Sequence, residues 1–229
     1  MPARSLFAKA RKEGRKLLTP GESFEALKLY KIPVAPYAVV RNADEAVKAA
    51  GKLGYPVALK VVSRKVTHKT DVGGVVLDVG SAEALRPAFE KMLARLKKAG
   101  VRPDAVLVQA MAAAGQQVIV GGKKDSQFGQ TVVFGAGGIY VELLADAAVR
   151  VAPITKADAY AMMAETRMYG ALKGFRGKSY DVDAVADVLV KASKLLTDNP
   201  GIAEMDINPV VVMPDSGGAV AVDARIVLE

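Results

Sequence analysis

The chain has 229 residues, of which 51% are hydrophobic; it lacks cysteine and carries a net charge of +8. The hydrophobic fraction predicts a folded core. The lack of cysteine excludes disulfides, iron–sulfur clusters and thiolate zinc sites, and no apolar run reaches the roughly 20 residues of a membrane span. The positive charge would suit nucleic acid, but only 6% of residues are aromatic and they do not alternate with basic residues, so we expect a cytoplasmic protein that binds neither nucleic acid nor membrane.

The first half of the chain is predicted to form an α/β lobe that follows a basic segment. Residues 1–18 have the pattern of a basic amphipathic helix, which we expect to form a loose arm. Residues 101–104 contain a proline and no periodic pattern, so they predict a boundary between two lobes, the first of which spans residues 19–104. The predicted helices span 21–30, 43–53 and 82–99, and the predicted strands span 38–40, 57–62 and 75–79.

The second half, residues 105–229, is predicted to form another lobe that is richer in strands. The glycine-rich residues 135–138 allow either a tight turn or close approach of the backbone to a ligand. Because strands and helices do not alternate strictly, we predict an α+β protein of two lobes rather than one doubly wound sheet, with a ligand between them. The predicted strands span 106–109, 117–120 and 131–134, followed by a strand carrying Glu142, helices over 156–166 and 183–196, and a hairpin of 204–213 with 219–228.

Two basic features of the first lobe could bind an anion. Lys60 lies within an otherwise apolar strand, where it either reaches solvent from the strand edge or contacts the phosphates of a nucleotide. Residues 63–74 hold several basic side chains and His68, the only histidine of the chain, and end in Gly73 and Gly74. Imidazole can act as a general acid or base or accept a phosphoryl group, although a lone histidine is more often an ordinary surface or core residue.

A cluster of oxygen ligands is predicted in the C-terminal hairpin. Strand alternation places Asp206 and Asn208 on the same face, and the returning strand can bring Asp223 beside Asn208. Such a set suits Mg²⁺, which also binds phosphates; the alternative is a polar strand end before Pro209. Walker A and Rossmann motifs are absent. The residues therefore predict a protein that handles ATP or ADP with magnesium.

Six stretches of the sequence, in this order, resemble the ATP-grasp superfamily. They most closely resemble the β subunit of the ADP-forming acyl-CoA synthetases, or acetate–CoA ligases, which are relatives of succinyl-CoA synthetase. The resemblance extends from about residue 19 to residue 228. The stretches are 68–75, 125–129, 134–138, 174–177, 206–209 and 222–225.

The resemblance implies a two-lobed ATP-grasp fold with the nucleotide in the cleft between the lobes. It also implies a reaction in which acyl-CoA, ADP and phosphate are converted reversibly to the acid, CoA and ATP. In such enzymes a separate α subunit holds CoA and a phosphohistidine. We therefore expect this chain to act only with a CoA-binding α subunit, in an α2β2 heterotetramer.

The resemblance further implies roles for individual residues. His68 would carry the phosphoryl group between the α-subunit phosphohistidine and ADP, Asp206 would face the incoming histidine, and Asn208 with Asp223 would hold Mg²⁺. One departure is Gln116-Gln117, where the family commonly has an acidic residue. The residues implied in nucleotide binding are Lys60, Ser63, Lys69, Gly73, Gly74, Gln109, Ala110, Met111, Glu142 and Arg176, with the stretch from Gln109 to Met111 acting as a hinge beside the adenine through its backbone.

Two other functions share parts of this pattern. A regulatory nucleotide-sensing domain would contain a similar ATP-grasp region, and a carboxylate–amine ligase would contain the same two lobes. Neither needs a histidine that accepts a phosphoryl group. His68 and the complete set of Asp206, Asn208 and Asp223 therefore favour the ligase subunit.

Overall fold

The computed structural model describes residues 2–63, 69, 71–138, 146–174 and 179–229. They form two compact units, one of Ala35–Ala112 and one that combines Met1–Val34 with Ala113–Glu229. These bounds differ from the expected lobes of residues 19–104 and 105–229. Residues 19–34 fold with the C-terminal unit, and the strand at 105–110 completes the sheet of the other unit, because strand pairing and packing join segments distant in sequence.

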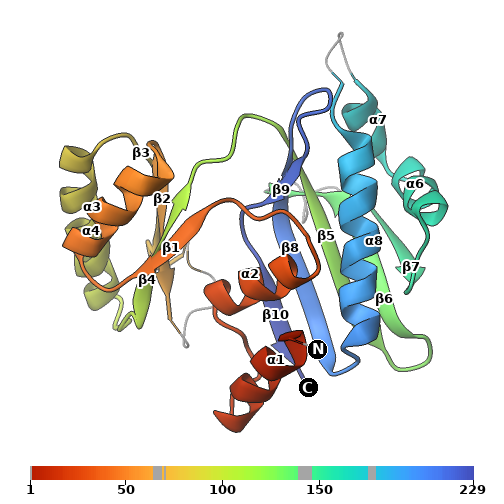
Figure 1. Ribbon diagram of the computed structural model, residues 1–229, viewed down its shortest axis with the longest axis horizontal. Helices are drawn as coiled ribbons and strands as arrows, with labels where there is room; N and C mark the ends of the chain where they lie inside the picture. Colours follow the sequence, from red (N-terminus) through yellow and green to blue (C-terminus); the bar gives the residue numbers. More distant parts are fainter. Residues whose placement is uncertain (1, 64–68, 70, 139–145, 175–178) are drawn as a thin grey trace. The chain divides into compact units, whose positions relative to one another are not determined.

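The unit of Ala35–Ala112 is a four-stranded antiparallel sheet covered by two helices (Figure 1). Val57, Leu59 and Val61 alternate along β2 and are buried in a core with the helices. Asn42 and Ser81 cap the two helices by accepting the backbone N–H of the third helical residue. The strand order is β1-β4-β2-β3, and the elements are β1 Tyr37–Val40, α3 Ala43–Leu53, β2 Val57–Val62, β3 Val75–Val79, α4 Ala82–Lys98 and β4 Ala105–Ala110.

The second unit is built on a six-stranded sheet whose main path is β10-β8-β5-β6-β7, with β9 paired to β8. The strands are antiparallel throughout. The elements are α1 Pro2–Lys12, α2 Pro20–Leu29, β5 Gln116–Asp125, β6 Gly129–Ala136, β7 Ala147–Val151, α6 Lys156–Ala164, α7 Arg167–Lys173, α8 Val182–Asp198, β8 Ile202–Val212, β9 Ala219–Ala221 and β10 Arg225–Leu228.

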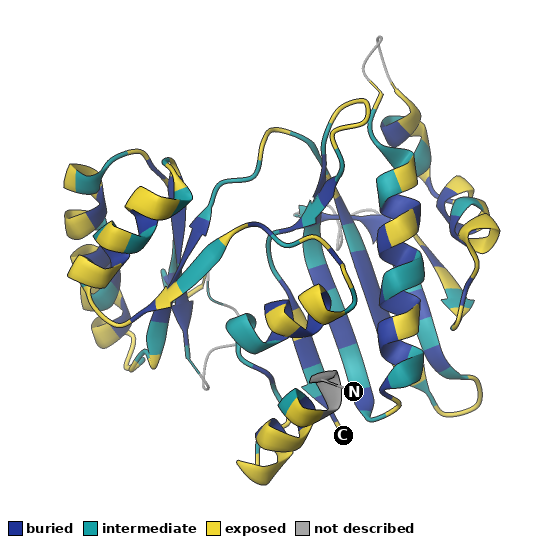
Figure 2. Cartoon of the chain, in the orientation of Figure 1, coloured by how far each residue is buried: buried dark blue, intermediate teal, exposed yellow. Residues whose placement is uncertain are grey.

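Helix α8 covers one face of this sheet. Its buried residues, among them Val185, Leu189 and Leu196, recur at helical spacing and form the dark stripe in Figure 2. The helix packs closely because β5 carries glycine beneath it: a Cβ at Gly122 would lie 2.3 Å from Leu196 Cδ1. Gly122 therefore marks the face of the sheet that α8 covers.

Most predicted elements are confirmed, and the differences follow from tertiary pairing. Helix α3 and strand β2 have the predicted ends. The returning arm of the C-terminal hairpin is interrupted, because β9 ends at Ala221 and β10 begins at Arg225. The predicted strand carrying Glu142 lies outside the described residues, and the partner of β6 is β7, which the sequence did not indicate.

The N-terminal segment is packed against its unit and is not the loose arm that its composition predicts. Phe7 and Ala10 of α1 are buried. The backbone of Lys16 and Leu18 hydrogen-bonds β10, with Leu228 N 2.6 Å from Lys16 O and Leu18 N 3.0 Å from Ile226 O. This pairing covers the outer edge of β10.

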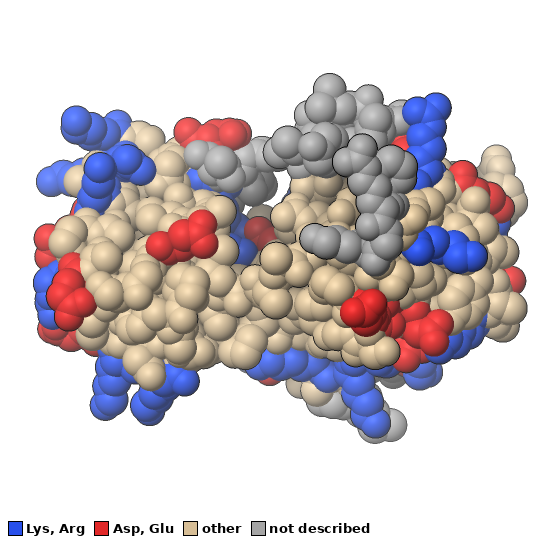
Figure 3. All heavy atoms as spheres, turned by 90° about the horizontal axis from the view of Figure 1, so that it is seen from above, with Lys and Arg blue, Asp and Glu red and all other residues tan. Residues whose placement is uncertain are grey.

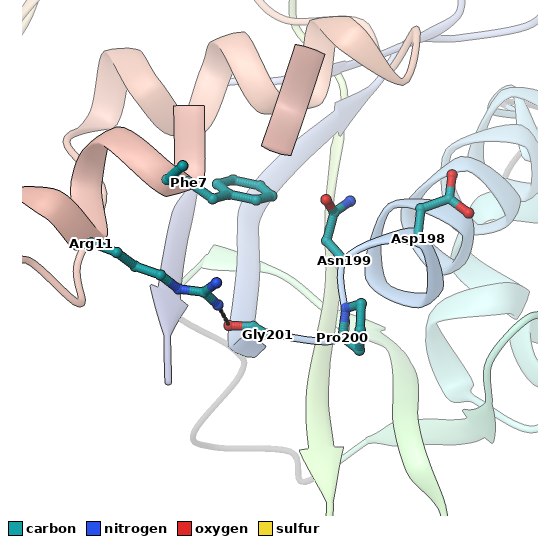
Figure 4. A pocket seen from close by; sticks show the side chains of 7 residues that line it. Phe7, Arg11, Asp198, Asn199, Pro200 and Gly201 are labelled. Atoms are coloured by element: carbon teal, nitrogen blue, oxygen red, sulfur yellow. Dashed lines mark hydrogen bonds between the residues drawn. The ribbon is translucent and has the colours of Figure 1, made fainter. Parts of the chain in front are cut away.

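Two arginine side chains of the arm, Arg11 and Arg15, bind other parts of the unit. Arg15 donates two hydrogen bonds of 2.8 Å to Glu22, which also completes a capping box with Thr19. Arg11 Nη2 donates to Gly201 O at 3.1 Å beside a cavity of about 300 Å³, which α1 forms with residues 198–201 (Figure 4). None of the predicted site residues lines this cavity.

The surface carries charges of both signs. Figure 3 shows Lys and Arg side chains interspersed with Asp and Glu over the face that it presents. Surface ion pairs such as Lys156–Asp187 and Arg225–Glu204 join neighbouring elements. Within the described ranges, no helix is both long and apolar enough to cross a membrane.

Candidate functional site

A row of register partners runs across the larger sheet and contains Asp206. Asp206 on β8 pairs with Arg225 on β10 and with Gly121 on β5. Gly121 pairs in turn with Val133 on β6, and Val133 pairs with Val149 on β7. Partners across an antiparallel pair share a face, and Gly121 is adjacent to Gly122, which faces α8. The row therefore lies on the face opposite α8, which we call the far face.

The carboxylate of Asp206 has an incomplete environment. Its Oδ1 is buried and has no hydrogen-bond partner among the described residues. Burial raises the pKa of Asp206, the charges of Glu204 and Asp223 raise it further, and Arg225 acts in the opposite direction. A buried acceptor without a partner costs free energy, so this oxygen is suited to a donor that arrives from outside the described residues.

Asn208 and Asp223 lie beside Asp206, as the alternation in the sequence predicts. Val222 N donates to Pro209 O at 3.1 Å, and Arg225 pairs with Asp206, so Asp223 falls at the level of Asn208. Asn208 Oδ1 accepts the N–H of Gly138 at 3.0 Å. This bond fixes the orientation of the Asn208 amide and connects the group of Asp206, Asn208 and Asp223 to the glycine-rich stretch at the end of β6.

The donor set fits a hard cation that keeps part of its hydration. Asn208 and Asp223 offer amide and carboxylate oxygens, which Mg²⁺ prefers, and Asp206 Oδ1 lacks a partner. Among the described residues, no group of three or more His, Cys, Asp or Glu side chains could hold a metal. Two protein ligands with water and phosphate oxygens correspond to the way Mg²⁺ binds nucleotides rather than to a closed protein cage.

Lys60 and Gln109 occupy one face of the four-stranded sheet. Lys60 pairs with Leu107 and Ala58 pairs with Gln109, so both polar side chains point away from the core of Val57, Leu59 and Val61. Lys60 is half-buried, and Gln109 is buried with no partner for its Nε2. This face therefore offers an ammonium group and an unused amide donor on adjacent strands.

The backbone at the predicted hinge is partly used by the fold. Ala110 N donates to Pro36 O at 2.9 Å, and Met111 N donates to Pro56 O at 3.1 Å. These two N–H groups are therefore engaged inside their own unit. The adenine contact that the resemblance implies would therefore not use these two N–H groups.

The double glycine has a packing role. Gly73 adopts φ +66°, and a Cβ at Gly74 would lie 2.4 Å from Val61 Cγ1. Gly74 N donates to Lys69 O at 2.8 Å, and Gly74 O accepts from Val61 N at 2.7 Å. Gly74 thus joins the basic stretch to β2, and the side chains of Ser63 and Lys69 are both half-buried.

Three predicted site residues, His68, Glu142 and Arg176, lie outside the described residues. Gln116 and Gln117, the departure from the family pattern, begin β5. Gln116 Nε2 lies 3.8 Å from Met168 Sδ, and Gln117 O accepts the N–H of Gly137 at 3.1 Å. The latter bond holds the glycine-rich stretch against β5.

The ATP-grasp domain family matches residues 9–228 of the chain. The chain belongs to the ATP-grasp family. It is 46% identical over 231 residues to the β subunit of ADP-forming acetate–CoA ligase I of Pyrococcus furiosus, and the alignment covers 99% of this chain and 97% of that protein. By this likeness it also belongs to the β subunits of the ADP-forming acetate–CoA ligases, as the sequence stretches predicted.

A longer relative and a solved structure extend the comparison. Acetate–CoA ligase I of Archaeoglobus fulgidus is 50% identical over 212 residues, which are 90% of this chain but 30% of that protein. A structure of acetyl-coenzyme A synthetase 1 from Ca. Korarchaeum cryptofilum, with coenzyme A and Ca-AMPCP, has a TM-score of 0.95 and 40% identity; the match covers 99% of this chain and 100% of that chain. The ATP-grasp fold predicted from the sequence is confirmed.

The far-face row includes residues that sequence reasoning did not select. Gly121, Val133 and Val149 have no unusual chemistry, and only strand register brings them into line with Asp206. The adjacent glycines at 121–122 were the available signal, because glycine within a strand often marks a close approach.

Proposed function

We propose that the chain is the nucleotide-binding β subunit of an ADP-forming acyl-CoA ligase, in which His68 carries a phosphoryl group between a phosphohistidine of a CoA-binding α subunit and ADP. The observation that carries this proposal is the buried, unpartnered Oδ1 of Asp206 beside Asn208 and Asp223. The likeness to a β subunit over 97% of that protein's length supports the division of labour.

The proposed roles are those that the family resemblance implies, and the geometry of each unit supports several of them. Asp206 accepts a hydrogen bond from the imidazole N–H of the incoming histidine and so orients its other nitrogen. Asn208 and Asp223 would hold Mg²⁺, which would neutralise phosphate charge during transfer. Lys60 contacts nucleotide phosphates and Gln109 contacts the base, with Ser63, Lys69, Gly73, Gly74, Ala110, Met111, Glu142 and Arg176 as the remaining nucleotide-site residues.

The chemical step exchanges one phosphorus bond for another. The bond from the histidine nitrogen to phosphorus breaks, and a β-phosphate oxygen of ADP forms the new bond to phosphorus, giving ATP and neutral histidine. A relative's structure with coenzyme A and Mg-AMPPCP has its phosphohistidine segment pointing towards the nucleotide-binding site; it has a TM-score of 0.88 and 40% identity. That arrangement supports the transfer of a phosphoryl group from a phosphohistidine to a bound nucleotide.

The partner is proposed to be a CoA-binding α subunit in an α2β2 assembly. The longer relative contains this region as 30% of its length, whereas the P. furiosus relative is a separate subunit. The remaining part of the reaction therefore belongs to sequence outside this region. The acyl group is expected to be chosen by that partner.

The relay is tested by mixing the chain with its α subunit, acetyl-CoA, labelled phosphate and magnesium, without ADP. Acid-labile label on His68 that moves to ADP when ADP is added is the expected result. His68→Ala removes the acceptor, and Lys52→Ala is the matched control because it replaces an exposed side chain of α3, in the same unit, that has no proposed role in the site. Continued ATP formation by the His68→Ala variant would show that the relay does not pass through this residue.

A further inference from the structure

The far face of the larger sheet carries an exposed apolar surface at its β7 end. Val149 and Val151 on β7 are 52% and 51% exposed. Val149 pairs with Val133 and Val151 pairs with Thr131, so their side chains lie on the far face together with Asp206. β7 is the last strand of the main path of its sheet, and an exposed apolar edge is a liability that natural proteins usually cover.

A further exposed apolar side chain lies on the turn that precedes β6, the strand paired with β7. The β5–β6 turn presents Phe128 with 65% of its surface exposed. Asp125 Oδ1 accepts the N–H groups of Gln127 at 2.8 Å and Phe128 at 2.9 Å, and Gly129 completes the turn at φ +75°. Hydrogen bonds from Phe128 and Gln127 also lower the pKa of Asp125. The conformation of the turn thus holds the ring in solvent.

The apolar surface is continuous with the row that contains Asp206. Gly121 and Val133 are the two register partners between Asp206 and Val149. At about 4.8 Å between strands, the backbones of Asp206 and Val149 are about 14 Å apart. A stable protein interface covers about 800 Å² on each partner, a patch about 30 Å across. A patch of this size that includes Asp206 is therefore large enough to include Val149 and Val151 as well.

We infer that Val149, Val151 and Phe128 form the docking surface for the CoA-binding α subunit; this inference rests on the proposed function. In the proposed relay the α-subunit phosphohistidine passes its phosphoryl group to His68, which transfers it beside Asp206, so the α subunit must approach the acidic end of the row. The same face extends to the valines, and helix α8 packs on the opposite face of these strands. The side chain of Lys123, exposed between its register partners Glu204 and Thr131, gives this surface a polar rim. Aromatic residues are enriched in interface cores, and the two exposed valines add apolar area to the surface.

The test uses the full chain and the α subunit encoded by the same genome. Val149→Gln/Val151→Gln removes the exposed apolar atoms, Phe128→Ser removes the aromatic ring, and Leu29→Gln is the control because Leu29 is 43% exposed on α2. Titration calorimetry should show that the double variant and Phe128→Ser each bind α about 30-fold more weakly, whereas the control stays within about twofold of wild type. Equal ADP binding by all variants shows that they are folded.

A kinetic measurement separates docking from chemistry. The α concentration that gives half-maximal phosphoryl transfer should rise with the dissociation constant, while the rate at saturating α stays within about twofold of wild type. If the double variant and Phe128→Ser bind α as tightly as wild type, while wild type transfers the phosphoryl group, the assignment of the docking surface is overturned. The proposed function then remains intact. A wild-type chain that neither binds α nor exchanges phosphate with it would overturn both.

Self-association is the remaining alternative for the same surface. Sedimentation of the chain alone, without α, should give a monomer for wild type and variants. A wild-type dimer that the valine substitutions dissociate would assign the surface to a second copy of this chain and overturn the assignment to α.

Discussion

The adjacent glycines of β5 should respond in opposite ways to the same substitution. Gly121 is on the far face beside Asp206, and Gly122 is under α8. At Gly122 an added Cβ would lie 2.3 Å from Leu196 Cδ1 and 2.5 Å from the backbone oxygen of Thr131. Overpacking of this kind costs about 1–3 kcal/mol, so Gly122→Ala should lower the free energy of unfolding by about 2 kcal/mol and the melting temperature by roughly 4–8 °C.

At Gly121 the same methyl group finds more room. Its nearest neighbours would be Met205 O at 3.1 Å and Val133 Cβ at 4.0 Å. Alanine gains about 0.5–1 kcal/mol over glycine in a strand, which offsets the tight carbonyl contact, so stability should change by less than about 1 kcal/mol. The methyl group would, however, stand beside the carboxylate of Asp206 and displace an arriving group, so phosphoryl transfer should fall about 10- to 100-fold.

The assays are urea unfolding followed by circular dichroism, and the transfer of label from phosphorylated α subunit to ADP at a temperature where both variants are folded. Gly122→Ala should unfold at lower urea and retain transfer, whereas Gly121→Ala should unfold like wild type and lose transfer. If Gly121→Ala is the less stable variant, or if Gly122→Ala alone loses activity while folded, the assignment of the two faces is incorrect.

Three further substitutions test the arm, the acidic site and the buried amide. Arg15→Met should lower the free energy of unfolding by about 1–2 kcal/mol at neutral pH. Burial raises the pKa of Glu22, but hydrogen bonds from Arg15 and Thr19 lower it overall, so the difference between variant and wild type should disappear as the pH falls through this lowered pKa. An unchanged difference in acid would contradict the pairing. Asp206→Asn should raise the free energy of unfolding by about 1–3 kcal/mol in urea titrations, because it removes a buried charge with an unpartnered oxygen, and should abolish transfer; a less stable variant would argue against this burial. Gln109→Leu should stabilise the chain by about 1 kcal/mol and weaken ADP binding about tenfold by calorimetry, and unchanged ADP affinity would remove Gln109 from the nucleotide site.

The local patterns of the sequence were sufficient for several parts of the fold and site. The run from Val57 to Val62 is apolar and β-branched apart from Lys60, and it forms a strand with those ends. The alternation of Asp206 and Asn208 around the buried Ile207 needed only the period of a strand. The family likewise followed from short motifs, because those motifs lie within single elements or turns.

The tertiary structure decided the features that depend on pairing between distant segments. The N-terminal arm is packed because residues 16–18 pair with β10, more than 200 residues later, and β4 joins the first unit because its partners are β1 and β2. The row from Arg225 to Val149 exists only through the register of four strand pairs, in which a shift of one residue would turn every side chain to the other face. Sequence determined which residues could bind nucleotide and magnesium, and long-range register determined which of their neighbours share a face with Asp206.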